Sequence, residues 1–264
     1  MAYDFILNVY SMKPIEELTK EVLKDIKLIV FDVDGVLVKR GTKIKQADGI
    51  TTLETKHIAS EQIEQIKKLK ELGFLININS GRGLYMLQDV FRDILSFTSI
   101  TYENGSATWY QGELIQHVNS FKYLQDVFLK LRGIEERYES VKGFEPKELI
   151  ITIHCEDRVQ EIEDIVGEKA DLYCLWNGEA YDIGVIDIQN KAVGLTAFRD
   201  YLGLAEHEVL AIGDNLNDKE MIDAAGVSVS ADPTRIVGDY FVPLEGERLP
   251  AALMMDQIIA EMSK

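Results

Sequence analysis

The sequence has few cysteines and few histidines. Two cysteines, Cys155 and Cys174, occur among 264 residues without a CxxC spacing, and the four histidines are scattered along the chain. These counts argue against a disulfide scaffold and a structural zinc site, and they favour a reducing compartment. With only 5 prolines and 46% hydrophobic residues, the composition is that of a folded globular chain and not of a disordered one.

Long apolar runs and positive charge are also scarce. No stretch approaches the roughly 18 apolar residues of a membrane span, and residues 1–8 lack the basic and apolar parts of a signal peptide. We therefore expect a cytoplasmic protein. The sequence has 28 Lys and Arg residues and 45 Asp and Glu residues, which gives a net charge of −17. Such a chain repels phosphate backbones and anionic lipid, so neither nucleic acid nor membrane is an expected partner, whereas a divalent cation is compatible with it.

Short apolar runs alternate with helical patterns along much of the chain. The runs are 27–31, 74–79, 98–102 and 209–212. They are typical of strands buried on both faces of a parallel sheet, and the helical spacing at 60–72 predicts a crossover helix between two of them. The order predicts an α/β fold with a doubly wound parallel sheet. Residues 14–26 predict one amphipathic helix, and residues 39–56 predict a long loop.

The pattern changes after Asn104-Gly105. A hairpin is expected within 106–118, and the Asn177-Gly178 turn predicts a second hairpin farther along the chain. These antiparallel signals predict an inserted α+β cap domain at 105–186, between two parts of a core domain at 1–104 and 187–264. The aromatic side chains of the insert are expected in its core: Trp109, Tyr173, Trp176 and Tyr181. The oligomeric state and the role of residues 1–26 stay open.

Polar residues stand where three of the predicted strands end. They are Asp32 with Asp34, Ser80, and Asp214 with Asp218. Ligands bind at the carboxyl ends of the strands in open α/β sheets, so we expect these side chains to converge in one crevice. Carboxylates this close need a counter-charge, and Mg²⁺ prefers oxygen ligands, often together with a substrate phosphate. The pattern therefore predicts a magnesium site.

The same residues are suited to phosphoryl transfer. Asp32 and Asp34 are two positions apart, so both side chains face one side of the chain. One can attack phosphorus as a nucleophile, and the other can protonate the leaving alcohol and then activate water. Ser80 and the Gly81 amide can bind phosphate oxygens, and Lys191 can stabilise the transferring group.

Four segments resemble, in order, the motifs of the haloacid dehalogenase superfamily. They are Asp32-Val33-Asp34-Gly35-Val36-Leu37, Ser80-Gly81-Arg82, Lys191, and Gly213-Asp214-Asn215-Leu216-Asn217-Asp218. The resemblance extends over nearly the whole chain from Lys27. One departure is Val36, where the family usually has threonine, a side chain that the chemistry does not require.

This resemblance implies roles for the acidic residues. Asp32 would be the nucleophile and Asp34 the general acid/base. Asp32, the backbone carbonyl of Asp34 and Asp214 would bind Mg²⁺. Asp218 would support the metal through water, and Asn217 would help to orient the site.

The resemblance also implies a phosphate site and a cap. Ser80, the Gly81 amide and Lys191 would hold the phosphate, and Arg82 would contact the cap or the substrate, or form a surface ion pair. The insert resembles a type IIB cap, as in Cof-type sugar phosphatases, sucrose-phosphate phosphatase and archaeal phosphoglycolate phosphatase. The expected partner is a small phosphorylated metabolite, such as a sugar or polyol phosphate, and the expected activity is its hydrolysis. A phosphomutase of the phosphomannomutase type and a non-catalytic binding module remain alternatives.

Overall fold

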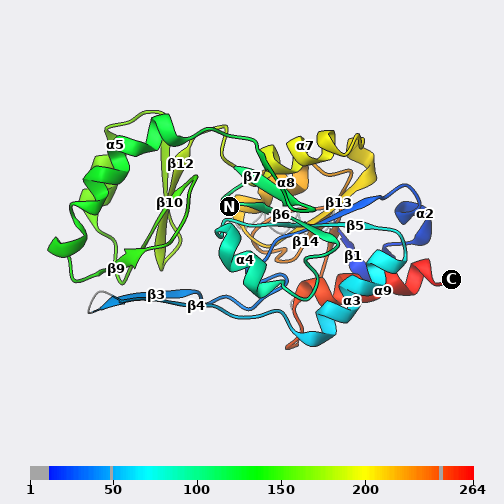
Figure 1. Ribbon diagram of the computed structural model, residues 1–264. Coiled ribbons are helices and arrows are strands. Elements are labelled where there is room, and N and C mark those ends of the chain that lie inside the picture. Colours follow the sequence, from blue (N-terminus) through cyan, green and yellow to red (C-terminus); the bar gives the residue numbers. More distant parts are fainter. Residues whose placement is uncertain (1–11, 48–49, 244–245) are drawn as a thin grey trace.

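A large, mostly parallel sheet forms the centre of the computed structural model, which describes residues 12–47, 50–243 and 246–264 (Figure 1). From one edge to the other, its strands are β1 (Lys13–Pro14), β15 (Tyr240–Phe241), β14 (Val227–Ser230), β13 (Val209–Gly213), β2 (Leu28–Phe31), β5 (Leu75–Asn79), β6 (Thr98–Tyr102), β7 (Ala107–Tyr110) and β8 (Glu113–Gln116). All pairs from β1 to β6 are parallel, and β7 and β8 are antiparallel. This arrangement confirms the predicted α/β class.

Helices cover both faces of this sheet. They are α3 (Ser60–Glu71), α4 (Leu84–Val90), α7 (Lys191–Tyr201), α8 (Lys219–Asp223) and α9 (Pro250–Met262). Ile29 and Phe31 of β2 pack in the cluster that contains residues of α3, α4 and α9, whereas Leu28 and Val30 pack in the cluster with α7 and α8. Because successive strand residues point to opposite faces, an apolar run such as this is buried on both sides.

A smaller antiparallel sheet lies beside the large one. Its order is β11 (Leu172–Trp176), β12 (Ala180–Val185), β10 (Ile151–Cys155) and β9 (Val141–Phe144). Helices α5 (Phe121–Arg132) and α6 (Gln160–Gly167) pack on one of its faces through a second apolar core. Figure 1 shows α5 on the side of this sheet that is turned away from the large sheet. The hairpin predicted at Asn177-Gly178 is confirmed as β11–β12, with Gly178 at φ +102°.

The strand pairing differs from the expected start of the insert at residue 105. The hairpin within 106–118 forms, but its strands β7 and β8 extend the large sheet, because the hairpin directly follows β6 and pairs with its free edge. The pairing therefore fits a start of the smaller part near residue 119. The division into core and cap domains stays a prediction, and residues 1–11 of its first segment lie outside the described residues.

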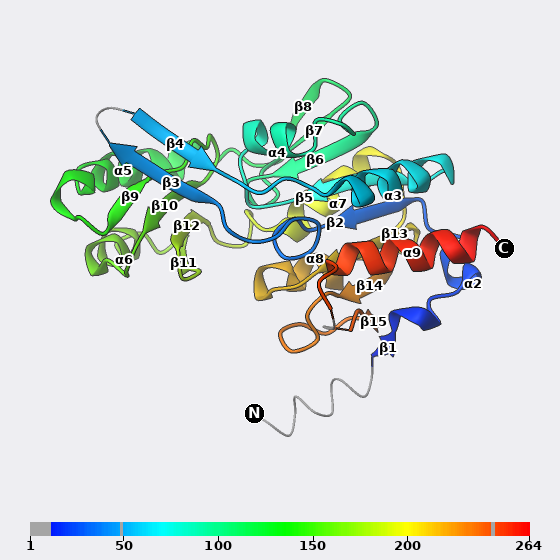
Figure 2. The same cartoon turned by 90° about the horizontal axis from the view of Figure 1, so that it is seen from below.

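The segment 39–56 is not the long loop that we expected. It forms an antiparallel hairpin of β3 (Lys43–Ala47) and β4 (Ile50–Glu54), and β3 contacts β9 of the smaller sheet (Figure 2). The polar composition of this segment did not indicate strands, because β3 packs beside β9, which is far along the chain. Ile44, only 6% exposed, is the apolar residue that this hairpin buries in β3.

The single helix predicted at 14–26 is also wrong. The segment holds a 3₁₀ turn, η1 (Ile15–Glu17), and a short helix, α2 (Lys20–Leu23). Pro14 is extended and pairs with β15, and Thr19 is extended again at φ −109° and ψ 162°, so the helical path is interrupted. The apolar residues nevertheless pack on the core as expected, since Leu18 and Leu23 are fully buried there.

Two glycines with positive φ form a matched pair for a stability test. A Cβ on Gly105 (φ +79°) would lie 2.1 Å from the backbone oxygen of Asn190, whereas one on Gly112 (φ +87°) would meet nothing within 4 Å. Gly112→Ala should lower the free energy of unfolding by about 1 kcal/mol through left-handed backbone strain. Gly105→Ala should lower it by about 2–4 kcal/mol, since overpacking adds to the strain. Equal losses in denaturant titrations would contradict the close approach at Gly105.

Candidate active site

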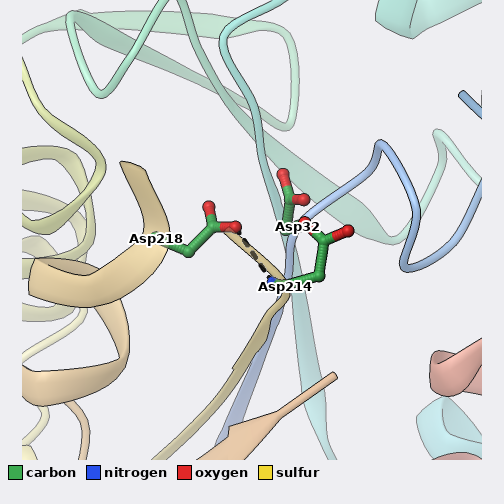
Figure 3. Close-up of side chains that lie close together, drawn as sticks. All are labelled: Asp32, Asp214 and Asp218. Atoms are coloured by element: carbon green, nitrogen blue, oxygen red, sulfur yellow. Dashed lines mark hydrogen bonds between the residues drawn. The ribbon is translucent and has the colours of Figure 1, made fainter. Parts of the chain in front are cut away.

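Three buried carboxylates meet at the carboxyl edge of the large sheet. Asp32 follows β2 and Asp214 follows the adjacent parallel strand β13, so the sheet itself brings the two together. Asp218 joins them from the turn η4 (Leu216–Asp218). Ligand atoms of all three lie within 4.8 Å of one another (Figure 3). The convergence expected from the sequence is present.

Two basic side chains offset part of the charge of these carboxylates. The Nζ atom of Lys191, at the start of α7, donates to Asp32 Oδ1 at 2.5 Å and also to Asp218. The half-exposed Arg40 lies at the base of the β3–β4 hairpin, and its Nη2 is 2.6 Å from Asp214 Oδ2. Lys191 therefore lies in the site, as the sequence predicted. No sequence pattern indicated that Arg40 would lie there.

Burial perturbs the charges of this cluster. It raises the pKa of Asp32 to about 8, with the negative charge of Asp218 adding to the effect. Burial likewise raises the pKa of Asp214. At Lys191 burial alone would lower the pKa, but the charges of Asp218 and Asp32 outweigh it and the pKa is raised. A cation beside these groups would favour the ionised carboxylates.

The cluster fits a divalent cation. The Oδ1 atom of Asp214 is buried and has no hydrogen-bond partner among the described residues, as expected of an oxygen meant for a metal. Gly35, at φ +90°, leaves room beside this carboxylate, because a Cβ there would lie 2.2 Å from Asp214 Oδ2. Carboxylate oxygens are the donors that Mg²⁺ takes, so Asp32 and Asp214 could hold it.

Asp34 is oriented by a buried arginine. Arg82 donates from Nε to Asp34 Oδ2 at 2.9 Å and from Nη2 to Oδ1 at 2.6 Å, and its Nη1 binds Thr55 Oγ1 at 2.5 Å. Such a two-point contact fixes the plane of the carboxylate. Of the roles left open for Arg82, the exposed surface pair is wrong, because the residue is only 5% exposed.

The loop after β5 contains the expected phosphate-binding groups. Ser80 is buried, and its Oγ accepts from the amide of Arg82 at 3.2 Å. Asn104 lies against this loop: its Nδ2 donates to Tyr173 of the smaller sheet at 3.2 Å, and a Cβ on Gly81 would be 2.8 Å from its Oδ1. Tyr173 therefore contacts the large sheet's loop and is not simply a core residue of the insert.

The structure places two further residues of the fourth motif, whose roles in the reaction stay predictions. Asn217 is exposed, and the structure does not place it among the buried site residues. Asp218 is fully buried, and its Oδ2 accepts from the amides of Asp214 and Asn215, each at 3.1 Å. Asp218 therefore orients both the β13 loop and Lys191, a positioning role that the spacing of the motif did not reveal.

Fold and site together define an α/β enzyme that gathers carboxylates at one edge of its sheet. The chain belongs to the haloacid dehalogenase-like hydrolases, whose family model matches residues 29–131 and 130–232. The family that the four sequence motifs indicated is confirmed.

Curated relatives are similar over most of this chain. A phosphoglycolate phosphatase of Methanospirillum hungatei is 28% identical over 213 residues, which cover 75% of this chain and 88% of the relative. The 5-amino-6-(5-phospho-D-ribitylamino)uracil phosphatase of Bacillus subtilis is 24% identical over 78% of this chain and 84% of its own. The chain spans about half of a putative bifunctional phosphatase/peptidyl-prolyl cis-trans isomerase of Streptococcus pyogenes, with 25% identity over 78% of this chain and 48% of that one.

A solved structure shares the fold. A haloacid dehalogenase-like hydrolase from Bacteroides thetaiotaomicron superimposes with a TM-score of 0.66 at 18% identity, over 88% of this chain and 99% of the other.

Among the described residues, no helix is both long enough and apolar enough to cross a membrane.

A metal-binding measurement tests the carboxylate cluster directly. Mg²⁺ at 100 times its dissociation constant should raise the free energy of unfolding by about 2.7 kcal/mol, because it binds the folded chain. Asp214→Asn should remove most of this gain in thermal unfolding experiments. The matched control is Asp223→Asn, an exposed acid of α8 that pairs with Lys219, and it should keep the gain. If Mg²⁺ raised the free energy of unfolding equally in both variants, the ion would not bind at Asp214.

Proposed function

We propose that this protein is a Mg²⁺-dependent phosphatase that hydrolyses a small phosphate monoester through an aspartyl-phosphate on Asp32. The observation that carries the proposal is the meeting of three buried carboxylates with Lys191 at the carboxyl edge of the sheet. Family membership supports a hydrolase, and the relatives of M. hungatei and B. subtilis are named as phosphatases.

Each site residue has a place in this reaction. Asp32, the backbone carbonyl of Asp34 and Asp214 would hold Mg²⁺, with Asp218 supporting it through water. The bound ion supplies positive charge to the phosphate and offsets the repulsion between the carboxylates. Ser80, the Gly81 amide and Lys191 would hold the substrate phosphate.

The chemistry takes two displacements at phosphorus. An Asp32 oxygen attacks the phosphorus, the bond to the ester oxygen breaks, and Asp34 gives its proton to the departing alkoxide. Asp34 then takes a proton from water, which attacks the same phosphorus, and the bond to Asp32 breaks to release inorganic phosphate. Both Asp34 oxygens accept from Arg82 in this structure, a contact that orients the ionised carboxylate. For Asp34 to carry the proton of the first step, one of these two hydrogen bonds must be released.

A phosphate-release assay tests this proposal. With Mg²⁺ and p-nitrophenyl phosphate, the wild type should release phosphate without any added bisphosphate, and EDTA should stop the reaction reversibly. Asp32→Asn should abolish turnover. Asp34→Asn should lower kcat about 10²–10⁴-fold with alkyl phosphate esters, whose leaving alkoxide needs a proton, and should lower it less with p-nitrophenyl phosphate.

The controls distinguish the alternatives. Asp223→Asn should keep wild-type turnover. Turnover that appears only with an activating bisphosphate, and that returns the phosphoryl group to a sugar, would favour the phosphomutase. Undiminished turnover in Asp32→Asn would refute the role of Asp32 as the nucleophile. Binding of phosphate esters by the wild type without any turnover would favour the non-catalytic binding module.

A further inference from the structure

The smaller sheet has one face without helices. On β10, Ile151, Ile153 and Cys155 pack with α5 and α6, so the intervening Thr152 and His154 point to the opposite face. Asp182 of β12 is paired with Thr152 and lies on that same open face. This face therefore carries polar side chains, with the exposed Leu175 of β11 opposite Asp182, in place of a second apolar core.

The open face is turned toward the phosphate-binding loop. Tyr173 of β11 accepts a hydrogen bond from Asn104, which lies against Gly81. A Cβ on Gly83 would be 3.0 Å from the backbone oxygen of Pro146 and 3.6 Å from Cγ of Lys147. The arrangement in Figure 1 agrees, since α5 is on the far side of the smaller sheet. Tyr173 and the segment that carries Lys147 therefore adjoin the loop at which we expect the substrate phosphate.

Five side chains form a compact group here, which we call the cap cluster: Glu145, Lys147, Thr152, His154 and Asp182. The Nζ atom of Lys147 is 2.6 Å from Thr152 Oγ1, 3.1 Å from Glu145 Oε2 and 3.8 Å from Asp182 Oδ1. Thr152 donates to Asp182 Oδ1 at 2.5 Å, and His154 Nε2 is 3.4 Å from Glu145 Oε2. The Asp182 side chain is 26% exposed, against 3% for Lys147, so Asp182 is the member that a ligand can reach.

The cap cluster has no surplus positive charge. Lys147 faces two carboxylates, which gives a net charge of −1, or zero if His154 is protonated. Burial alone would raise the pKa of Glu145, but Lys147 and His154 outweigh it and lower the pKa to about 2, so Glu145 is ionised at neutral pH. On the neighbouring loop Arg82 is already paired with Asp34. A second anionic group on the substrate would therefore meet two carboxylates in the cap cluster, and the cations Lys147 and Arg82 are already paired with carboxylates.

We propose that the cap cluster selects phosphate esters whose leaving group is uncharged and carries hydroxyl groups, and that it rejects esters with a carboxylate in the leaving group. Asp182 accepts a hydrogen bond from a substrate hydroxyl, and Thr152 helps to hold Asp182 in place. A substrate carboxylate at the same point is repelled by Asp182 and lacks the donors that a free lysine would offer.

This inference rests on the proposed phosphatase activity and sharpens it. The names of the relatives span both substrate classes, since one is named for phosphoglycolate and another for a phosphoribityl compound. The charges of the cap cluster favour the second class for this chain.

Two substrates of similar size separate the possibilities. Phosphoglycolate and 2-hydroxyethyl phosphate differ only in a carboxylate against a hydroxymethyl group. With Mg²⁺, the wild type should show a kcat/KM at least tenfold higher for 2-hydroxyethyl phosphate, and ribitol 5-phosphate should be better still. Asp182→Asn should reduce the preference about tenfold, mainly by raising kcat/KM for phosphoglycolate. Thr152→Val should lower kcat/KM for ribitol 5-phosphate.

The control is Asp171→Asn, which removes the same charge from an exposed position at the start of β11 and should leave the preference unchanged. A wild-type preference for phosphoglycolate, or an equal ratio in wild type and Asp182→Asn, would overturn the selection by the cap cluster. Either result would leave the phosphatase proposal intact if p-nitrophenyl phosphate is hydrolysed. Absence of phosphate release from every ester, p-nitrophenyl phosphate included, would overturn the proposed function and this inference together.

Discussion

The active-site edge of the large sheet must hold Asp32, Asp214 and Asp218 together against their mutual repulsion. Three carboxylates whose ligand atoms lie within 4.8 Å of one another, in a buried place, are unfavourable without cations. Lys191 from α7 and Arg40 from the base of a hairpin meet part of that charge. The parallel pairing of β2 and β13 holds the carboxylates in place despite their repulsion, because both strands are buried on their two faces.

The groups that we propose for catalysis and for substrate selection lie on different parts of the chain. The buried carboxylates Asp32 and Asp214 follow strands of the large sheet, whereas the cap cluster lies on the smaller one. Glu103 links the two: it is fully buried, and its carboxylate accepts hydrogen bonds from the amides of Glu148, Leu149 and Ile150 just before β10. Anchoring at this point fixes the segment that carries Lys147 against the loop of the phosphate site.

The sequence predicted what is encoded locally. Apolar runs such as 28–31 predicted strands buried on both faces, and the polar residue at the end of each run predicted the edge where Asp32 and Asp214 meet. Features that depend on distant partners were missed. The β3–β4 hairpin is polar and is stabilised beside β9, some hundred residues farther on. The two-point contact of Arg82 with Asp34 and the net charge of the cap cluster likewise arise only once separate segments are adjacent.

The β3–β4 hairpin connects the smaller sheet with the carboxylate cluster of the large sheet. Its strand β3 contacts β9 of the smaller sheet, while Arg40 at its base binds Asp214. Any rotation of the smaller sheet away from the large one must therefore either separate β3 from β9 or pull on the segment that carries Arg40. The position of the cap cluster is in this way mechanically coupled to the charge balance at Asp214, the metal ligand that we propose, through the segment from Arg40 to β3.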